Sequence, residues 1–335
     1  MRHVRTLLIG LALLAALAVP LLLGGRSTLF ELAQVPPADI FAITGMAMLG
    51  WLARAAKLGL LMRRLDLHPS RARVVAISLA TEFAFLATPG GVGGYAAGVY
   101  YARGVGASLP CAGSITAADQ LLDLMFFALV LPLAVFGLAE MPLPAGLREA
   151  ALICSALLCA VLIALVAAHR VLGRWLFAPR GLVSRLPSLR RHAAALRDFF
   201  ASCSTRLRQL AGGGQRFMLG LFVCTTVQWL VRYGLLWLIL AHLGSPLPFA
   251  FVLLLQGIVL HAAAWTGIPS GGGGADLGLA AALAPMVPLA SLGTALLLWR
   301  FATLYLPLVA GLAALLALRV RPARVRSEPE AVGAG

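Results

Sequence analysis

The chain alternates between long apolar runs and short polar segments that are rich in arginine. Six of the runs approach or exceed the length of about 20 residues that an α-helix needs to cross a bilayer. We therefore expect an all-α polytopic membrane protein, with residues 1–335 forming a single integral membrane domain. The six predicted full spans are residues 6–24, 38–61, 112–138, 147–168, 217–241 and 291–318.

Two short motifs occur twice at nearly the same distance. Trp51-Leu52-Ala53-Arg54 returns as Trp229-Leu230-Val231-Arg232, 178 positions later. The heptapeptide 88–94, Thr-Pro-Gly-Gly-Val-Gly-Gly, returns 180 positions later as 268–274, Ile-Pro-Ser-Gly-Gly-Gly-Gly. Because two different motifs share one offset, the pattern predicts a duplicated unit, with repeat one over 38–138 and repeat two over 217–318.

The Pro-Gly motifs predict two re-entrant hairpins, at 69–103 and 249–286, each turning at its proline. Unpaired backbone groups cost several kcal/mol each in hydrocarbon, so non-helical backbone survives there only inside protein or beside a wet cavity. Glycine lets backbone or ligand come close. Helices that begin near Gly93 and Gly274 would direct their positive ends towards an anionic group. The alternative is that the glycines only permit tight helix packing.

The placement of arginine predicts the orientation, because positive residues concentrate in cytoplasmic loops. If 69–103 turns back, the segment 169–216, with ten arginines and one acid, lies inside. If 69–103 crosses the membrane, that segment lies outside, against the rule. We expect both termini to be cytoplasmic in a bacterial inner membrane, and 25–37 to be an outer loop. The cytoplasmic segments are then 1–5, 104–111, 169–216 and the tail 319–335.

This orientation has a consequence for symmetry. Span 38–61 runs inward and its counterpart 217–241 runs outward, so the two halves are predicted to be inverted repeats. Such folds keep their substrate site near the midplane, where the two Pro-Gly tips are expected to meet.

Composition narrows the class of protein. Hydrophobic residues make up 61% of the chain and charged residues 12%, outside the range of soluble globular proteins. The formal charge of +15 lies largely in loops that set topology, so we expect no binding to nucleic acid. The five cysteines show neither metal-ligand spacing nor a disulfide framework. We expect no metal and no cofactor.

The N-terminal apolar run is either a signal peptide or a retained first span. We favour the retained span, because the run is long and lacks a clear cleavage site.

The basic segment 169–216 contains an amphipathic pattern. Apolar side chains recur at alternating steps of four and three, at Leu189, Ala193, Leu196, Phe200, Cys203, Leu207 and Leu210. Arginines fill the other faces. The pattern predicts a helix on the anionic cytoplasmic leaflet, or else a solvated linker helix whose charge only sets topology.

Ionisable residues within spans are costly and are functional candidates by default. Asp119 and Asp123 are four residues apart and share one helix face. We expect them to form one cluster with Arg232 and Arg300 around the cavity, although the same charges would also serve as structural pairs. The candidate substrate-binding residues are Arg54, Glu82, Pro89, Gly90, Gly91, Gly93, Gly94, Asp119, Asp123, Arg232, Pro269, Gly271, Gly272, Asp276 and Arg300.

Other polar residues predict little chemistry. His261 is expected to be a hydrogen-bonded packing residue, since no second histidine or acid stands at ligand spacing. No catalytic motif stands out, and we do not expect an enzyme.

These motifs carry a family resemblance. Glu82, the motif 88–94 and an acid in the following helix resemble the transmembrane region of lysylphosphatidylglycerol synthases and their stand-alone relatives. The second motif with Arg300 downstream is similar too, and the likeness covers roughly 38–318. The resemblance implies a flippase-type domain without the soluble domain that aminoacylates the lipid. The family's second motif often carries Glu after its glycines, where this sequence has Asp276.

The expected function is the movement of a lipid, with an anionic head group, between leaflets. Three alternatives stay open. A small soluble anion would use the same cavity, and a membrane-embedded transferase would use Glu82, Asp119 or Asp123 as a general base. A non-transporting partner would anchor a separate lipid-modifying enzyme through 169–216.

Overall fold

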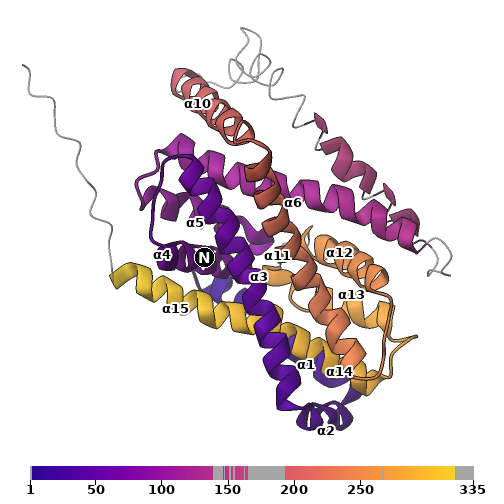
Figure 1. The fold of residues 1–335 in the computed structure, drawn as a ribbon. Coiled ribbons are helices and arrows are strands. Elements are labelled where there is room, and N and C mark those ends of the chain that lie inside the picture. The colour runs from indigo at the N-terminus through magenta and orange to yellow at the C-terminus, as the bar shows by residue number, and fades with distance from the viewer. Residues whose placement is uncertain are drawn as a thin grey trace, which may run out of the picture.

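The computed structural model describes residues 2–138, 193–265 and 268–320, together with 146, 148–150, 152–153, 155–161 and 163–164. Residues 2–138, 193–265 and 268–320 contain twelve α-helices, the described residues from 148 to 164 are helical as well, and none of the described residues forms a strand (Figure 1). The described part is therefore an all-helical, multi-span membrane protein, as the hydropathy pattern predicts.

Four helices are long and apolar enough to cross a membrane. They are α3 (Pro37–Arg64), α6 (Leu109–Gly137), α11 (Gln215–His242) and the continuous helix Leu289–Arg319. Each coincides with a predicted span. The last one consists of α14 (Leu289–Arg300), a π-helical turn η3 (Phe301–Tyr305) and α15 (Leu306–Val320). The predicted span 147–168 falls largely outside the described residues.

The N-terminal region differs from the prediction. The helix α1 (Arg2–Gly24) is followed at once by α2 (Arg26–Gln34), so 25–37 is not a simple loop. The two helices meet at an angle of 98° and count together as at most a fifth span. Gly25 makes the bend with φ +57°, a conformation that costs glycine little. Polar groups of α2 then bind α14, where Thr294 donates to the carbonyl of Thr28 at 3.2 Å.

Both Pro-Gly motifs form the predicted broken helices. The first hairpin consists of α4 (Arg71–Leu86), the 3₁₀ turn η1 (Pro89–Gly91) and α5 (Val92–Arg103). The second consists of α12 (Phe249–Trp265), the turn η2 (Pro269–Gly271) and α13 (Gly274–Leu283). In each case the two helices of the hairpin contact one another, and η1 contacts η2. The prediction that the two tips meet is confirmed.

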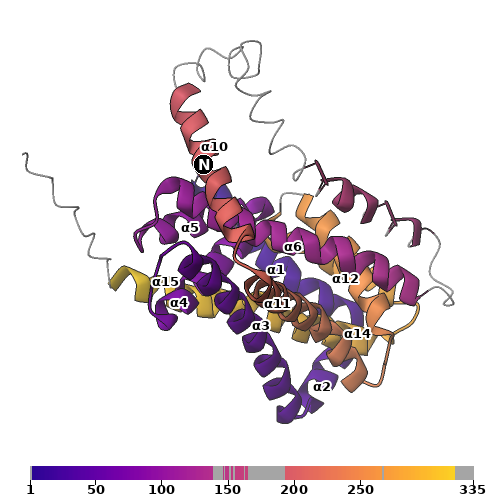
Figure 2. The same cartoon turned by 45° about the horizontal axis from the view of Figure 1, so that its top comes forward.

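The order of elements repeats along the chain. The elements α11, α12, η2, α13 and α14 begin 178 to 182 residues after α3, α4, η1, α5 and α6, respectively. The first helices of the two sets, α3 and α11, lie side by side in the centre (Figures 1 and 2). They are antiparallel, because Met46 lies by Gly234 near one end of the pair and Leu60 lies by Gly220 near the other.

Helices of each set also pack on helices of the other set. Helix α4 of the first set packs on α15 of the second, and α12 of the second set packs on α6 of the first. The helix that precedes each set also packs on the other set. Helix α1, before the first set, packs on α14 of the second, and α10 (Ala193–Ala211), before the second set, packs on α6 of the first. Figure 2 shows α10 leaving the bundle beside α6.

Helix α10 corresponds to the predicted amphipathic helix. Its apolar side turns out to contact protein: Phe199 and Cys203 lie against Gly113, and Leu210 is buried. The Ser114 hydroxyl on α6 donates to the carbonyl of Cys203 at 3.3 Å. The described part of this apolar face is therefore mainly a packing surface, although Phe200 remains exposed.

The contact between α4 and α15 generates a stability prediction. A Cβ at Gly311 would lie 2.7 Å from the Leu79 carbonyl oxygen and 2.6 Å from Phe83 Cβ, so the two helices would have to separate. We expect Gly311→Ala to lower the free energy of unfolding by about 1–3 kcal/mol. Gly45→Ala is the control, because its Cβ would meet nothing within 4 Å. The control should be neutral or stabilising by up to about 1 kcal/mol. Equal stability of the two variants in detergent would contradict this packing.

Candidate functional site

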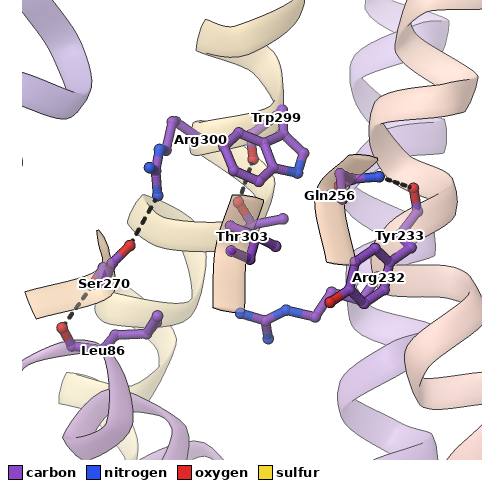
Figure 3. A pocket seen from close by; sticks show the side chains of 9 residues that line it. Leu86, Arg232, Tyr233, Gln256, Ser270, Trp299, Arg300 and Thr303 are labelled. Atoms are coloured by element: carbon purple, nitrogen blue, oxygen red, sulfur yellow. Dashed lines mark hydrogen bonds between the residues drawn. The ribbon is translucent and has the colours of Figure 1, made fainter. Parts of the chain in front are cut away.

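The two tips form one joint with a shared backbone conformation. Gly90 and Ser270, which are equivalent by the 180-residue offset, have φ/ψ of 59°/13° and 56°/13°. Ser270 is one of two described non-glycine residues with positive φ. Its hydroxyl donates to the carbonyl oxygen of Leu86 at 2.7 Å, which ties the second tip to the first (Figure 3).

Beside this joint, the two arginines of the repeated tetrads bind one carboxylate. Arg54 on α3 donates to Glu82 Oε2, and Arg232 on α11 donates to Glu82 Oε1 at 2.7 Å. The Glu82 side chain is 6% exposed, so this carboxylate is almost fully withdrawn from solvent. Two guanidinium groups share one carboxylate, which leaves this Glu82 cluster with a net charge of +1.

A second cluster fixes the second tip. Arg300 binds Asp276 through two parallel bonds, from Nε at 2.5 Å and from Nη2 at 2.7 Å. Both residues are buried, at 3% and 0% exposure. Arg300 Nη1 also donates to the carbonyl of Ser270 at 3.4 Å (Figure 3). The π-helical turn begins directly after Arg300, and such turns frequently occur at functional sites.

The third cluster contains the two aspartates of α6. Lys57 Nζ lies 2.7 Å from Oδ1 of Asp119 and 2.7 Å from Oδ1 of Asp123. The indole of Trp229, from the second tetrad, donates to Asp123 Oδ1 at 2.9 Å. The shared face of the two acids is confirmed.

The predicted single cluster of Arg232, Arg300, Asp119 and Asp123 is wrong. The structure divides these residues among three clusters, and Arg300 pairs with Asp276 instead of with an acid on α6. The sequence places Lys57 among the ionisable residues within spans, but Lys57 was not among the candidate substrate-binding residues. Lys57 lies seven residues before the end of α3, close to a run of basic residues, yet it is 0% exposed. Its i+3 spacing from Arg54 was the available signal.

The glycines of the first tip serve packing and turn geometry. A Cβ at Gly94 would overlap the Phe85 ring, and one at Gly93 would overlap the Thr88 side chain. Gly91 combines φ +72° with Phe85 close by. Only Gly90 is exposed with open space around it. The packing alternative therefore accounts for most of this motif.

The second tip is buried more deeply. Pro269, Gly271 and Gly272 are all buried, and Gly271 has φ +62° with Ala263 at its side. Pro89 and Pro269 each open their 3₁₀ turn, where a missing N–H costs nothing.

The helix ends at the tips already have partners. The Gly93 N–H donates to the Thr88 hydroxyl at 2.8 Å, and the Gly273 N–H donates to Asp276 Oδ2 at 3.1 Å. An anion does lie at the start of α13, as the dipole argument expects, but that anion is the protein's own Asp276 carboxylate.

Three small cavities connect the clusters. The inner cavity contains Arg54, Thr81 and Asp119; the central cavity contains Arg54, Glu82 and Arg232; the tip cavity contains Arg232, Ser270 and Arg300. Arg54 therefore borders the first two and Arg232 the last two. Their volumes are about 40, 30 and 50 Å³. These volumes hold a few water molecules and are too small for a phospholipid head group.

Each cavity has one buried polar atom without a hydrogen-bond partner among the described residues. These atoms are Thr81 Oγ1, Gln228 Oε1 and Trp299 Nε1. Buried polar groups almost always have partners, so such atoms indicate a place for water or a ligand. In Figure 3 the Arg232 side chain extends from α11 towards the tip residues, and the Trp299 ring lies beside the same space.

His261 makes the predicted hydrogen bond and a packing contact, although the residue is exposed. Its Nδ1 lies 2.6 Å from the Gly257 carbonyl oxygen, and its ring contacts Phe127 edge-on. Over the described ranges, no group of three His, Cys, Asp or Glu side chains could hold a metal ion.

The pairing of Arg300 generates a second prediction. Removing one member of a buried ion pair costs about 3–5 kcal/mol, because the other charge is left uncompensated. We expect Asp276→Asn and Arg300→Gln each to destabilise strongly, and the double variant to lose about 1–3 kcal/mol less than their sum. The matched control is Asp123→Asn with Arg300→Gln, which should be additive to within about 0.5 kcal/mol. The free energies of unfolding of the single and double variants are measured in mixed micelles. If only the control double variant departs from the sum of its single variants, the Asp276–Arg300 pairing is refuted.

Comparison with known proteins adds the family. The model of the lysylphosphatidylglycerol synthase TM region matches residues 7–311, and no other domain is detected in the 335 residues. None of the curated proteins matches the sequence. The match spans both hairpins, the tetrads and all three ion clusters, so this chain belongs to the lysylphosphatidylglycerol synthase TM region family.

Proposed function

We propose that this protein moves a lipid with an anionic head group between the leaflets of the membrane, through the three cavities beside the tips. One observation carries the proposal. Arg232 stands about 15 Å from one end of α11 and about 26 Å from the other, yet its side chain is 33% exposed. An arginine that reaches the surface so far from both helix ends needs an anion or water there.

The charge of the Glu82 cluster favours an anionic ligand. Its net charge of +1 is uncompensated within the cluster, whereas the Asp276–Arg300 pair is neutral. Arginine suits the phosphate of a lipid, because its planar fork makes two parallel bonds. A phosphodiester beside Arg54 and Arg232 would complete the charge balance of this cluster.

The apolar surface beside Arg54 favours a lipid over a small soluble anion. The neighbours of Arg54 on α3 include Leu49 and Leu52, which are 50% and 53% exposed, as expected for a surface that faces acyl chains. A head group would pass along Arg54 and Arg232 while its chains stay in the bilayer. Since the cavities are small, we propose that this conformation is closed and that the tips separate for passage.

Inverted symmetry provides a means for that separation. The antiparallel pair α3 and α11, the recurring element order and the packing of each set on the other all support a pseudo-two-fold axis in the membrane plane. In such folds one repeat rocks against the other around a fixed site. The Ser270–Leu86 bond would act as a latch between the repeats, because it joins one tip to the other.

The basic segment has a separate role in this proposal. Arg197 and Arg208 of α10 are exposed, while its apolar side packs on α6. We propose that 169–216 contacts the anionic cytoplasmic leaflet by charge, at about 1 kcal/mol for each basic residue near the surface.

The ligand role of Arg232 is testable. Arg232→Gln leaves Arg54 and Glu82 as a neutral pair, so the protein should still fold. Because a bond to a charged group contributes about 1.5–3 kcal/mol, movement of labelled phosphatidylglycerol in proteoliposomes should fall at least about tenfold. Arg103→Gln is the control, since this exposed arginine lies outside the clusters. Unchanged movement in Arg232→Gln would remove the residue from the site. Inhibition by a soluble anion such as phosphate, without lipid movement, would favour the small-anion alternative.

The orientation is tested by cysteine labelling in intact cells. On a cysteine-free background, we expect a cysteine at residue 185 to be protected from an impermeant reagent and one at Ser245, between α11 and α12, to be labelled. Labelling of residue 185 from outside would overturn the re-entrant hairpins and the inverted symmetry.

A further inference from the structure

The Lys57 cluster lies apart from the tips and has an unusual charge balance. One ammonium group is shared by two carboxylates at 2.7 Å each, so the ionised cluster carries a net charge of −1. Lys57 is fully buried, and the aspartate side chains are 17% and 15% exposed. A net charge in such surroundings costs several kcal/mol. One proton on the aspartate pair would remove it.

We propose that Asp119 and Asp123 together bind one proton, and that this proton couples lipid movement to the proton gradient. The proposal rests on the proposed lipid movement for its coupling, while the proton site stands on the cluster alone. One O–H bond forms at a carboxylate oxygen, the cluster passes from −1 to neutral, and Lys57 keeps its ammonium. The proton enters from water on one side of the membrane and leaves to water on the other.

The geometry leaves room for this proton. Among the described residues Asp123 Oδ2 has no hydrogen-bond partner, and Asp119 Oδ2 accepts only a long bond of 3.4 Å from Gln120. Asp119 lines the inner cavity together with the unpartnered hydroxyl of Thr81. A water in that cavity would reach both groups and carry the proton. Because the acids share one ammonium, the proton belongs to the pair and to neither residue alone.

A metal cation fits this cluster less well. Hard cations need several oxygen ligands around a central position. Here Lys57 Nζ already occupies the position between the two carboxylates. A bound cation would have to expel a fully buried ammonium, whereas a proton adds to an outer oxygen without moving it.

Other charged and titratable groups lie around the cluster. Arg54 on α3, Tyr95 on α5 and Arg232 on α11 interact electrostatically with the aspartates. Cys224 on α11 interacts with Lys57, and His261 on α12 contacts Phe127 of α6. On α10, Arg206 acts on Cys111 near the start of α6. None of these groups forms a hydrogen bond to either aspartate within the described part of the chain. Lys57 is therefore the ion partner bonded to the pair, and Arg54, which lines the inner cavity with Asp119, supplies a further positive charge beside it.

The cluster is mechanically connected to the lipid site. Lys57 follows Arg54 by three residues on α3, and Arg232 follows Trp229 by three residues on α11. Trp229 donates to Asp123, and the Arg232 guanidinium lies 5.9 Å from the centre of a Trp229 ring. Protonation of the pair weakens the charge-assisted bond from Trp229. One of the contacts that hold α11 on α6 is thereby weakened, beside the packing of Phe127 on Trp229, which links proton binding to the position of a head-group ligand.

Proton binding is measured without transport, by infrared titration of the full protein in phosphatidylcholine nanodiscs. We expect one protonated-carboxyl signal that is lost in both Asp119→Asn and Asp123→Asn. Each variant leaves one acid with Lys57, and the amide introduced by Asp123→Asn keeps an oxygen that accepts from Trp229. Asp198→Asn is the control and should retain the signal, because this exposed acid on α10 lies outside the three clusters. Absence of the signal in the wild type, or its persistence in both variants, would overturn the site.

Coupling is measured by the movement of labelled phosphatidylglycerol in vesicles under a pH gradient. One bound proton corresponds to a change of up to about tenfold per pH unit. We expect that response in the wild type and its loss in Asp123→Asn. A response to a sodium gradient instead, or no response in a wild type that moves lipid, would refute coupling. A wild type that moves no lipid but keeps the carboxyl signal would refute the proposed function and leave the proton site intact.

Discussion

Charge compensation in a medium without water is the constraint on which this structure depends. The buried charges Lys57, Glu82, Asp276 and Arg300 all have an opposite charge within bonding distance. Each of these contacts joins different helices, so compensation also fixes how the helices pack. Because breaking such a contact strands a charge in the bundle, the ion pairs select one packing arrangement among the many that apolar surfaces would permit.

The three clusters differ in net charge. The pair at the second tip is neutral and fully buried, so it holds the tip in place. The Glu82 cluster has one positive charge too many, and the Lys57 cluster has one negative charge too many. Both clusters include side chains of α3 and α11, the helices that carry the repeated tetrads, although the excess negative charge itself lies on α6. The two imbalances are opposite in sign and border one cavity, so they cancel while both clusters are ionised. An anion at the first cluster and a proton at the second, bound together, would keep that balance, which is why the two proposals concern neighbouring turns of the same helices.

The two tips share one backbone conformation but differ in their contacts. Gly90 and Ser270 adopt the same left-handed conformation, but only the serine has a hydroxyl, and it bonds to the other tip. The first tip is more exposed, and the Thr88 hydroxyl accepts a hydrogen bond from the Gly93 N–H there. The second tip is buried and is held by the Asp276–Arg300 pair. A joint with one anchored side and one exposed side is suited to opening by movement of the exposed side.

The sequence by itself determined four of the spans, the recurring order of elements, the broken helices and the meeting of the tips. These features follow from local rules: apolar length, backbone φ at glycine and proline, and the hydrogen bonds that hydrocarbon demands. The tertiary structure alone decided the ion partners. Lysine and arginine side chains are long, so helix rotation and crossing, which no local pattern encodes, select the acid that each one reaches. For the same reason Arg300 pairs with Asp276 instead of Asp123, and Lys57, which the sequence places near a basic helix end, lies at the centre of a cluster.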